Sequence, residues 1–253
     1  MNESERARSI LKRLSAMPSV GSGAAIATGF GALDAALGGG LPRGRIVEMF
    51  GPAGCGKTTL ALQCIVHLQR AGSSTAFIDA EQTFDPAYAG SLGVTIDQMP
   101  VVQPSSAEQA IGIACALAAS GAVDLIVVDS AAALTPRLEV EAGVTENIPR
   151  LQSRVLSNEL RKLSSAIRRG NASVLFLNQM RTRVERGAGE AETSAGGPPL
   201  KLFAAVRIAM LPAGGSRLKL RVIKNSVGAA GTDRELEWRR GSGFVADASL
   251  KTS

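Results

Sequence analysis

The sequence predicts an α/β fold built on a mostly parallel β-sheet. Short apolar runs alternate with stretches of helical spacing over most of the chain. This alternation indicates right-handed crossovers between neighbouring parallel strands. Polar side chains directly follow several of the apolar runs, and folds of this class bind ligands at the carboxyl ends of their strands. We therefore expect one sheet whose carboxyl edge carries the functional site.

The individual elements are expected in the following order. Helices are predicted over 9–17, 32–37, 57–70, 105–120 and 150–169. Strands are predicted over 46–50, 74–79, 124–129 and 174–179, followed by an antiparallel extension over 203–211, 217–224 and 235–239. The polar segment 180–199 lacks periodicity, so we expect a long functional loop there. The expected domains are an N-terminal helix and linker (1–27), a core (28–245) and a C-terminal tail (246–253).

The length of the chain allows one large α/β domain or two small ones, and its cysteine usage indicates a reducing compartment. Of the 253 residues, 45% are hydrophobic and 20% charged, which is enough for a substantial core. The three cysteines have no metal-ligand spacing and form no even disulfide set. The charged N-terminus lacks the apolar core of a signal peptide, and the longest apolar stretch is too short to span a membrane. We therefore expect a cytoplasmic protein without a membrane partner.

A glycine-rich loop between a predicted strand and a predicted helix is the most specific motif of the chain. It has the full pattern of a phosphate-binding loop (P-loop), which comprises Gly51, Pro52, Ala53, Gly54, Cys55, Gly56, Lys57 and Thr58, with Thr59 following. Glycines let backbone N–H groups turn toward phosphates, and the helix N-terminus adds unpaired donors. Lys57 is expected to reach the β- and γ-phosphates, and the Thr58 hydroxyl to coordinate Mg²⁺. The motif predicts a nucleoside triphosphate and Mg²⁺ as ligands.

Polar side chains at the ends of other strands are candidates for the chemistry around the phosphates. Asp129 follows four apolar residues, and its carboxylate can hold Mg²⁺ opposite Thr58; a capping role is the alternative. Glu81 is the candidate for polarising an attacking water, against the alternative of a salt-bridged surface residue. Gln179 can sense the γ-phosphate and link it to the loop that follows, or it can cap a local turn.

Charge is distributed unevenly around a net value of +6. Residues 75–149 contain ten acidic residues and one basic, whereas 150–186 contain nine basic and two acidic, and 201–240 nine basic and three acidic. A basic surplus of this kind indicates either a polyanion-binding surface or a solvated basic face. The candidates for contacting nucleic-acid phosphates are Arg150, Arg154, Arg181, Arg183 and Arg186. Because few aromatic residues lie between them, we expect backbone contact without base reading.

Taken together, these motifs resemble the bacterial RecA recombinase family. The similarity extends over 28–240 and is most specific in an ordered set of segments, namely 41–48, 51–60, 77–81, 85–88, 120–124, 127–130, 133–136, 177–179 and 222–225. The resemblance implies a RecA-type P-loop NTPase core that uses ATP and Mg²⁺. It also implies a homo-oligomeric helical filament on single-stranded DNA, with double-stranded DNA as a second partner, in homologous recombination and DNA repair.

The resemblance also implies roles for individual residues. Glu81 would be the catalytic glutamate, and Asp85 and Tyr88 would contact adenine, Tyr88 by stacking. Gln179 would be the switch between ATP and the second of two DNA-binding loops, which correspond to 137–150 and 180–199. Lys224 would reach across the subunit interface to the ATP of a neighbour.

The chain departs from the family pattern in ways that leave other functions open. Ser226 stands where the family has a second lysine, and the middle of the second loop lacks the usual apolar and aromatic residues. The sequence ends at Ser253 without the small C-terminal domain expected from the family. An accessory module that binds ATP without catalysis and docks on a recombinase or repair polymerase is the main alternative. A ring-forming NTPase motor is a third, which the match at 222–225 argues against.

Overall fold

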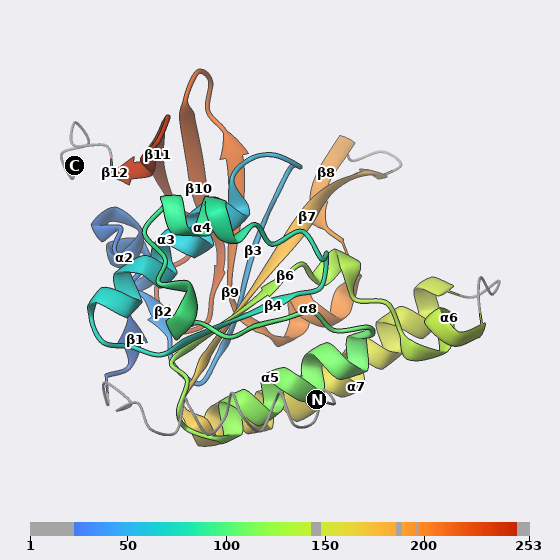
Figure 1. Cartoon of the computed structure of the whole chain (residues 1–253). Helices are drawn as coiled ribbons and strands as arrows, with labels where there is room; N and C mark the ends of the chain where they lie inside the picture. The colour runs from blue at the N-terminus through green and yellow to red at the C-terminus, as the bar shows by residue number, and fades with distance from the viewer. Residues whose placement is uncertain (1–22, 143–147, 186–188, 196, 247–253) are drawn as a thin grey trace.

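The computed structural model describes residues 23–142, 148–185, 189–195 and 197–246. These residues form a central β-sheet with helices on both faces (Figure 1), which confirms the α/β fold expected from the sequence. The α-helices are α2 (Gly31–Leu37), α3 (Lys57–Arg70), α4 (Pro86–Ser91), α5 (Ala107–Ala119), α6 (Arg137–Ala142), α7 (Ile148–Gly170) and α8 (Pro198–Phe203). Two 3-10 turns are η1 (Ile96–Gln98) and η2 (Ala131–Ala133).

The central sheet has a parallel part and an antiparallel part. Its path runs β12-β11-β10-β9-β3-β7-β6-β4-β5, and β8 pairs with the end of β7. The strands from β9 to β5 are parallel, and those from β9 to β12 are antiparallel, as expected for the extension. The bounds are β3 (Ile46–Gly51), β4 (Thr75–Asp79), β5 (Val101–Val102), β6 (Leu125–Asp129), β7 (Ser173–Glu185), β8 (Gly189–Ser194), β9 (Ala204–Pro212), β10 (Arg217–Asn225), β11 (Thr232–Arg239) and β12 (Gly243–Ala246).

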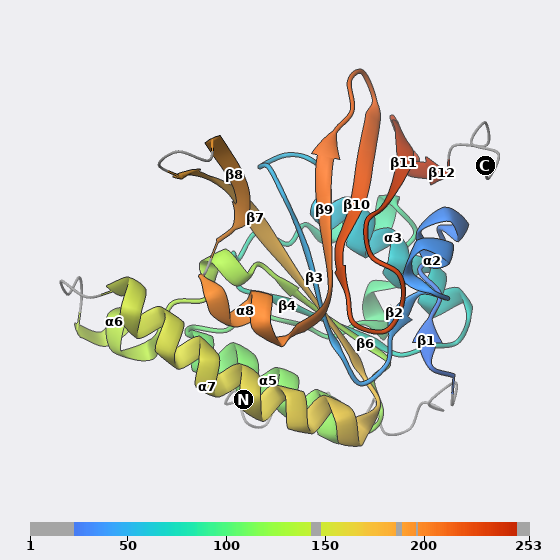
Figure 2. The same ribbon diagram turned by 180° about the vertical axis from the view of Figure 1, so that it is seen from behind.

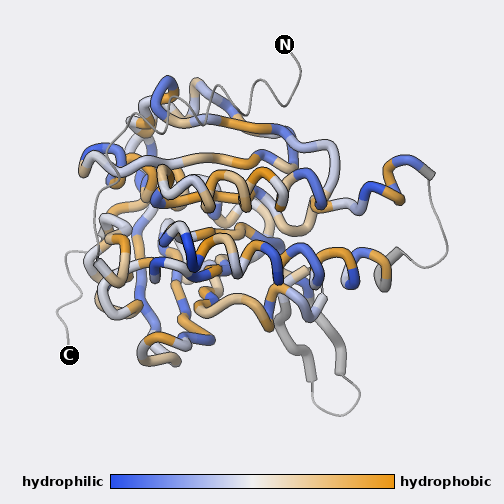
Figure 3. Tube along the Cα trace, turned by 90° about the horizontal axis from the view of Figure 1, so that it is seen from below, coloured by the Kyte–Doolittle hydropathy of each residue, from blue (hydrophilic) through white to orange (hydrophobic). Residues whose placement is uncertain are grey.

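Each face of the sheet has its own buried apolar layer. Helices α2 and α3 pack on one face, against side chains such as Val47 and Met49 of β3. Helices α5, α7 and α8 cover the other face, where Ile46 of β3 is buried (Figure 2). Hydrophobic and hydrophilic residues alternate along several helical segments of the chain (Figure 3). Helix α7 is amphipathic, since it buries Leu156, Leu160 and Leu163 and exposes Arg154 and Arg161. No helix in the described part of the chain has the length and hydrophobicity that a bilayer crossing requires.

The prediction of a long loop over 180–199 is wrong. Strand β7 continues through Glu185, and β8 returns beside it in antiparallel register from Met180↔Ser194 to Glu185↔Gly189. Helix α8 then starts at Pro198, a residue favoured in the first turn. Backbone pairing holds the hairpin where its polar sequence shows no apolar alternation, which is why periodicity did not reveal it. The β7–β8 hairpin projects on the same side of the molecule as α6 (Figure 1).

Sequence patterns also missed several short elements. These are α4, α6, α8, β5, β12 and a separate two-stranded sheet of β1 (Ala25–Ile26) with β2 (Leu41–Pro42). Strand β1 falls within the segment 1–27 that was expected to be helix and linker, so its last residues pair with the core. The helix predicted over 9–17 lies outside the described residues. Elements of two to six residues are too short to show a period.

Candidate active site

The P-loop joins β3 to α3 at the carboxyl edge of the sheet (Figure 1). Gly54 and Gly56 have φ values of 71° and 89°, in the left-handed region that favours glycine. A Cβ atom on Gly56 would lie 2.6 Å from Phe244 Cζ, so space as well as conformation requires glycine there. Gly56 is the N-cap of α3, and the first N–H groups of a helix lack intrahelical partners. The loop therefore offers donors and a positive dipole end to an anion.

Lys57 is held against the loop that precedes it. Its Nζ donates hydrogen bonds to the carbonyl oxygens of Gly51 at 3.1 Å and Pro52 at 2.7 Å. Phosphate oxygens would offer charged acceptors in place of these neutral carbonyls, and charge-assisted hydrogen bonds are the stronger kind. The Lys57 ammonium is therefore positioned so that a bound phosphate can replace the carbonyl oxygens as its hydrogen-bond acceptor.

Thr58 and Asp129, the two residues predicted to share a cation, contact each other directly. The Thr58 hydroxyl donates to Asp129 Oδ2 at 2.7 Å. Asp129 is 7% exposed, and this burial raises its pKa to about 6, against the opposing effect of the Thr58 hydrogen bond. The nearby carboxylates of Glu81 and Asp79 raise it further. One hydroxyl and a buried carboxylate beside a phosphate-binding loop are the oxygen ligands that fit Mg²⁺.

Glu81 lies at the same edge, next to the end of β6. The Ser130 hydroxyl donates a hydrogen bond to its Oε1. Its backbone N–H donates to the carbonyl oxygen of Asp129 at 3.1 Å. Glu81 is half-buried, so it is held in place while remaining open to water. Sequence reasoning did not single out Ser130, although it directly follows Asp129.

A small hollow of about 60 Å³ adjoins this cluster, and its lining includes Thr58, Asp129, Asp85 and Tyr88. Asp85 caps α4, since its side chain accepts from the N–H groups of Ala87 at 2.8 Å and Tyr88 at 3.1 Å. The Tyr88 hydroxyl lies 2.6 Å from Thr59 Oγ1 on α3. Asp85 and Tyr88, which are expected to contact the adenine, therefore lie beside α3, the helix that starts at the P-loop.

Gln179 also lies beside the P-loop, because it pairs with Gly51 in the parallel register of β7 and β3. It is exposed, and its backbone is held by two hydrogen bonds. Its N–H donates to Asn178 Oδ1 at 2.9 Å, and its carbonyl oxygen accepts from the Ala195 N–H at 2.9 Å. Gln179 is thus not the end of its strand, as the sequence suggested, but the point where β7 leaves the sheet to form the β7–β8 hairpin.

The predicted DNA-contacting arginines that the structure describes lie on α7 and on the β7–β8 hairpin. Arg154 and Arg181 are exposed, whereas Arg186 lies outside the described residues. Arg150 belongs to the first turns of α7, and Arg183 to β7.

Lys224, on β10, contacts the end of α8. Its Nζ donates to the carbonyl oxygens of Lys201 at 3.0 Å and Leu202 at 3.3 Å. Burial lowers the pKa of Lys224, and the charge of Arg207 lowers it further.

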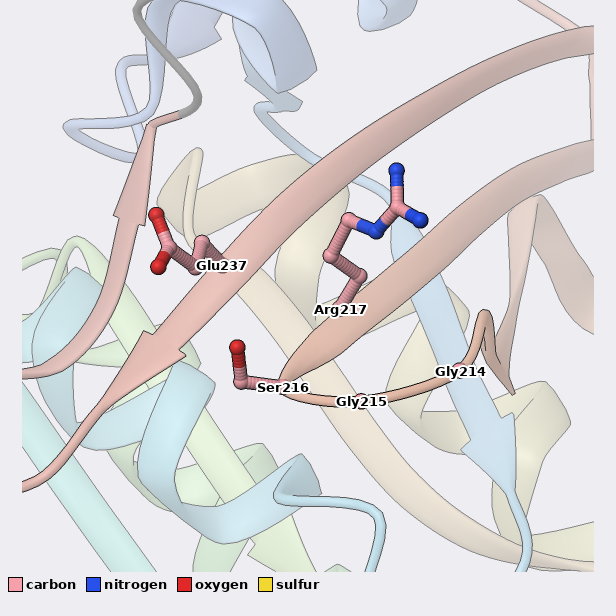
Figure 4. A pocket seen from close by; sticks show the side chains of 5 residues that line it. All are labelled: Gly214, Gly215, Ser216, Arg217 and Glu237. Atoms are coloured by element: carbon pink, nitrogen blue, oxygen red, sulfur yellow. The ribbon is translucent and has the colours of Figure 1, made fainter.

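A second hollow, of about 330 Å³, lies at the turn between β9 and β10. It is lined by Gly214, Gly215, Ser216, Arg217 and Glu237 (Figure 4). Arg217 forms a 3.8 Å ion pair with Glu235 on the neighbouring strand. The lining consists of turn residues together with Arg217 and Glu237 of the neighbouring strands, and it brings together none of the residues expected to act on phosphates.

A family model described as the RecA N-terminal domain matches residues 8–243. The chain belongs to the RecA family. Protein RecA of Caulobacter vibrioides, in two strains, is 44% identical over 229 residues, and that of Caulobacter sp. (strain K31) is 43% identical. Each alignment covers 87% of this chain and 64% of the relative, so the chain spans less than two thirds of their length.

Comparison of structures agrees with this assignment. A crystal structure of the RadB recombinase matches with a TM-score of 0.67 and 22% sequence identity. The match covers 88% of this chain and 99% of that chain. At this identity the likeness establishes the RecA-type fold, with its mostly parallel sheet and antiparallel strands.

Proposed function

We propose that this RecA-family chain is a DNA-dependent ATPase that assembles on single-stranded DNA and acts as a recombinase in DNA repair. The observation that carries the proposal is the meeting of Lys57, Thr58, Asp129 and Glu81 at one edge of the sheet, beside a P-loop of full pattern. The set contains a phosphate cation, two oxygen ligands for Mg²⁺ and a carboxylate that can orient water.

The chain's own residues divide the proposed work as follows. The P-loop N–H groups and Lys57 bind the β- and γ-phosphates. Mg²⁺, when bound, neutralises charge on these phosphates. Thr58 and Asp129 would hold the ion, and Asp85 and Tyr88 would orient the adenine. Glu81, fixed by the Ser130 hydroxyl, would position the attacking water and accept its proton.

The hairpin and α7 supply the proposed DNA surface. Arg154, Arg181 and their neighbours would bind phosphates without reading bases, first of single-stranded and then of double-stranded DNA. Gln179 joins this surface to the nucleotide, since it pairs with Gly51 and opens the hairpin. Lys224 would complete the ATP site of the next subunit in a filament.

An ATP-binding accessory module is the second candidate. Ser226 favours it, because the family pattern has a second lysine there for the contact between subunits. In this candidate the chain binds ATP and docks on a recombinase or a repair polymerase without DNA-stimulated turnover.

Steady-state ATP hydrolysis with and without single-stranded DNA tests the proposal. We expect DNA to stimulate turnover, and we expect Lys57→Ala to abolish it by removing the γ-phosphate contact. Glu81→Gln should retain ATP binding while hydrolysis stalls, because the amide cannot accept the proton of water.

Three outcomes would count against parts of this proposal. ATP binding without stimulation by DNA would support the accessory module. Unchanged turnover in Glu81→Gln would remove that residue from its role. Closed rings in electron micrographs, instead of open helices, would indicate a ring-forming motor.

A further inference from the structure

A fully buried carboxylate lies in the strand that leads into the P-loop, and the proposed chemistry does not use it. Glu48 of β3 has no exposed surface, although it sits within an apolar run. Its Oε2 accepts from Arg207 Nε at 2.5 Å, and its Oε1 accepts from Asn178 Nδ2 at 2.8 Å. One side chain thus fixes a residue of β9 and a residue of β7 on either side of the central strand.

Both partners of Glu48 lead to the base of the β7–β8 hairpin. Arg207 Nη2 donates to Ser194 Oγ, at the end of β8, at 3.1 Å. Asn178 Nδ2 also donates to the carbonyl oxygen of Ala195 at 3.0 Å. The carboxylate is therefore connected to both ends of the hairpin through buried or half-buried groups.

The same contacts also connect Glu48 to residues beside the P-loop, at the carboxyl edge of the sheet. Asn178 Oδ1 accepts from the N–H of Gln179, the proposed γ-phosphate sensor. The Arg207 guanidinium lies 4.9 Å from the ring centroid of Phe50, which directly precedes Gly51 of the P-loop. Lys224 is an electrostatic neighbour too, since the charge of Arg207 lowers its pKa and that of Glu48 raises it.

Desolvation makes this arrangement cooperative. A buried charge that loses its partner is strongly destabilised, so contacts among Glu48, Arg207 and Asn178 are favoured over their separation. A shift of Gln179 toward a phosphate would displace Asn178, to which it is hydrogen-bonded. The displacement would be transmitted through Glu48 and Arg207 to Ser194. A connected network of buried polar groups is a physical route by which one site can bias another.

We infer that Glu48 is a positioning residue that couples the nucleotide edge of the sheet to the β7–β8 hairpin. The inference rests on the proposed function, because it concerns how ATP and DNA influence each other. Glu48 contacts neither ligand; it acts through Asn178 and Arg207.

The test compares two variants by the ratio of ATP hydrolysis with and without single-stranded DNA. Ser194→Ala cuts the link between Arg207 and the hairpin while leaving the buried ion pair intact. Glu48→Gln keeps an acceptor for Asn178 but removes the charge that pairs with Arg207. Coupling free energies in proteins typically correspond to factors of about 5 to 150. We expect each variant to lose at least about five-fold in the stimulation ratio, while DNA-free turnover stays near the wild-type value.

Two matched controls separate coupling from mere loss of stability. Asp124 is 3% exposed, bonds Arg43 Nη2 at 2.7 Å and accepts from the Ser74 N–H at 3.0 Å, so Asp124→Asn breaks a comparable pair away from the hairpin. Ser173 is fully buried at the start of β7 and donates to the Pro42 carbonyl oxygen at 2.6 Å, so Ser173→Ala matches Ser194→Ala. Both controls should keep the wild-type stimulation ratio.

The outcomes distinguish failure of the inference from failure of the proposed function. If wild-type turnover responds to DNA and Ser194→Ala responds equally, coupling does not pass from Glu48 through Arg207 to the hairpin, and the inference as stated is wrong. If the controls lose as much stimulation as the variants, the effect is one of stability and the inference is wrong. If DNA leaves even the wild type unstimulated, the proposed function itself fails. Should Glu48→Gln not fold, Ser194→Ala still decides the result.

Discussion

At the scale of single residues, the protonation of Asp129 governs the proposed metal subsite. The carboxylate is buried and accepts a hydrogen bond from Thr58, and burial raises its pKa to about 6. The ionised form that a cation requires is therefore the form that the metal-free fold disfavours. Binding of Mg²⁺ would remove this cost.

We expect Asp129→Asn to stabilise the metal-free protein at neutral pH. The Asp129 carboxyl of the wild type has a pKa of about 6 in the folded state, against an ordinary value of 3.8, so the folded state binds more protons between these pH values. The free energy of unfolding of the wild type therefore falls as pH rises through this window. Since one unit of pKa shift is worth about 1.4 kcal/mol, the variant should gain about 3 kcal/mol at about pH 7.5 and little near pH 4.

Urea unfolding in the presence of EDTA measures this difference at both pH values. Asp97→Asn serves as the control, since Asp97 is exposed. An Asp129→Asn difference that is the same at both pH values would show that the carboxyl titrates alike in the folded and unfolded states.

At the scale of elements, hydrogen bonds join the edge strand β12 to α3, the helix that starts at the P-loop. Gln63 of α3 donates to the carbonyl oxygens of Ser242 at 3.1 Å and Phe244 at 2.9 Å, and it accepts from the Phe244 N–H at 2.8 Å. The Phe244 ring is 4% exposed and packs against Gly56. The last strand of the described fold thus supports the first turn of α3.

We expect Gln63→Ala to loosen the P-loop. Loss of these bonds leaves partly buried backbone groups unpaired, which costs about 1–3 kcal/mol, and it frees Phe244 from Gly56. Hydrogen exchange of the amides in 51–59 should accelerate, together with a fall in melting temperature.

Gln69→Ala is the matched control on the same helix. Gln69 makes a similar amide clamp, donating to the Thr95 carbonyl oxygen at 3.0 Å and accepting from the Thr95 N–H at 2.9 Å, at the opposite end of α3. Its loss should leave exchange in the P-loop unchanged. Equal acceleration in both variants would show that the helix as a whole, and not β12, supports the loop.

Helix α7 allows a second prediction at this scale. Arg154 is exposed near the start of α7, and Arg168 is exposed near its end. If the start of the helix binds DNA, Arg154→Ala should reduce the log–log salt dependence of single-stranded DNA affinity by about 0.7, the value for one phosphate.

Fluorescence anisotropy over a range of salt concentrations gives both slopes. Arg168→Ala should retain the wild-type slope. Equal slopes for both variants and the wild type would place the DNA surface elsewhere.

At the scale of the whole molecule, the proposed ATP site belongs to two subunits. Lys57 and Lys224 lie on different elements, and Lys224 contacts the end of α8 within its own chain. In a filament, Lys224 of one subunit would face the P-loop of the next. Each interface would then need one residue from either side.

Mixing two inactive variants tests this arrangement. Lys57→Ala lacks a working P-loop, and Lys224→Ala lacks the proposed contact to its neighbour. A mixture contains interfaces with an intact P-loop from one variant and an intact Lys224 from the other, so DNA-stimulated hydrolysis should partly return. Turnover that stays absent in the mixture, or Lys224→Ala alone with wild-type turnover, would contradict a shared site.

Much of the site could be predicted from the sequence because it depends on local chemistry. The P-loop follows from glycines, a lysine and a hydroxyl at fixed spacing, and Asp129 from a carboxylate at the end of an apolar run. The β7–β8 hairpin could not, because its residues pair across a turn without apolar alternation. Glu48 and Arg207 were missed, although a charged residue inside an apolar run was a signal.

The sequence by itself determined the α/β class, the P-loop and the strand ends where polar residues would meet, because backbone preference and side-chain type act within short segments. The tertiary structure alone decided which strands are neighbours. The register that sets Gly51 beside Gln179, and Glu48 between Asn178 and Arg207, joins positions far apart in the chain. Such long-range pairing depends on burying all the segments together, which no single segment specifies.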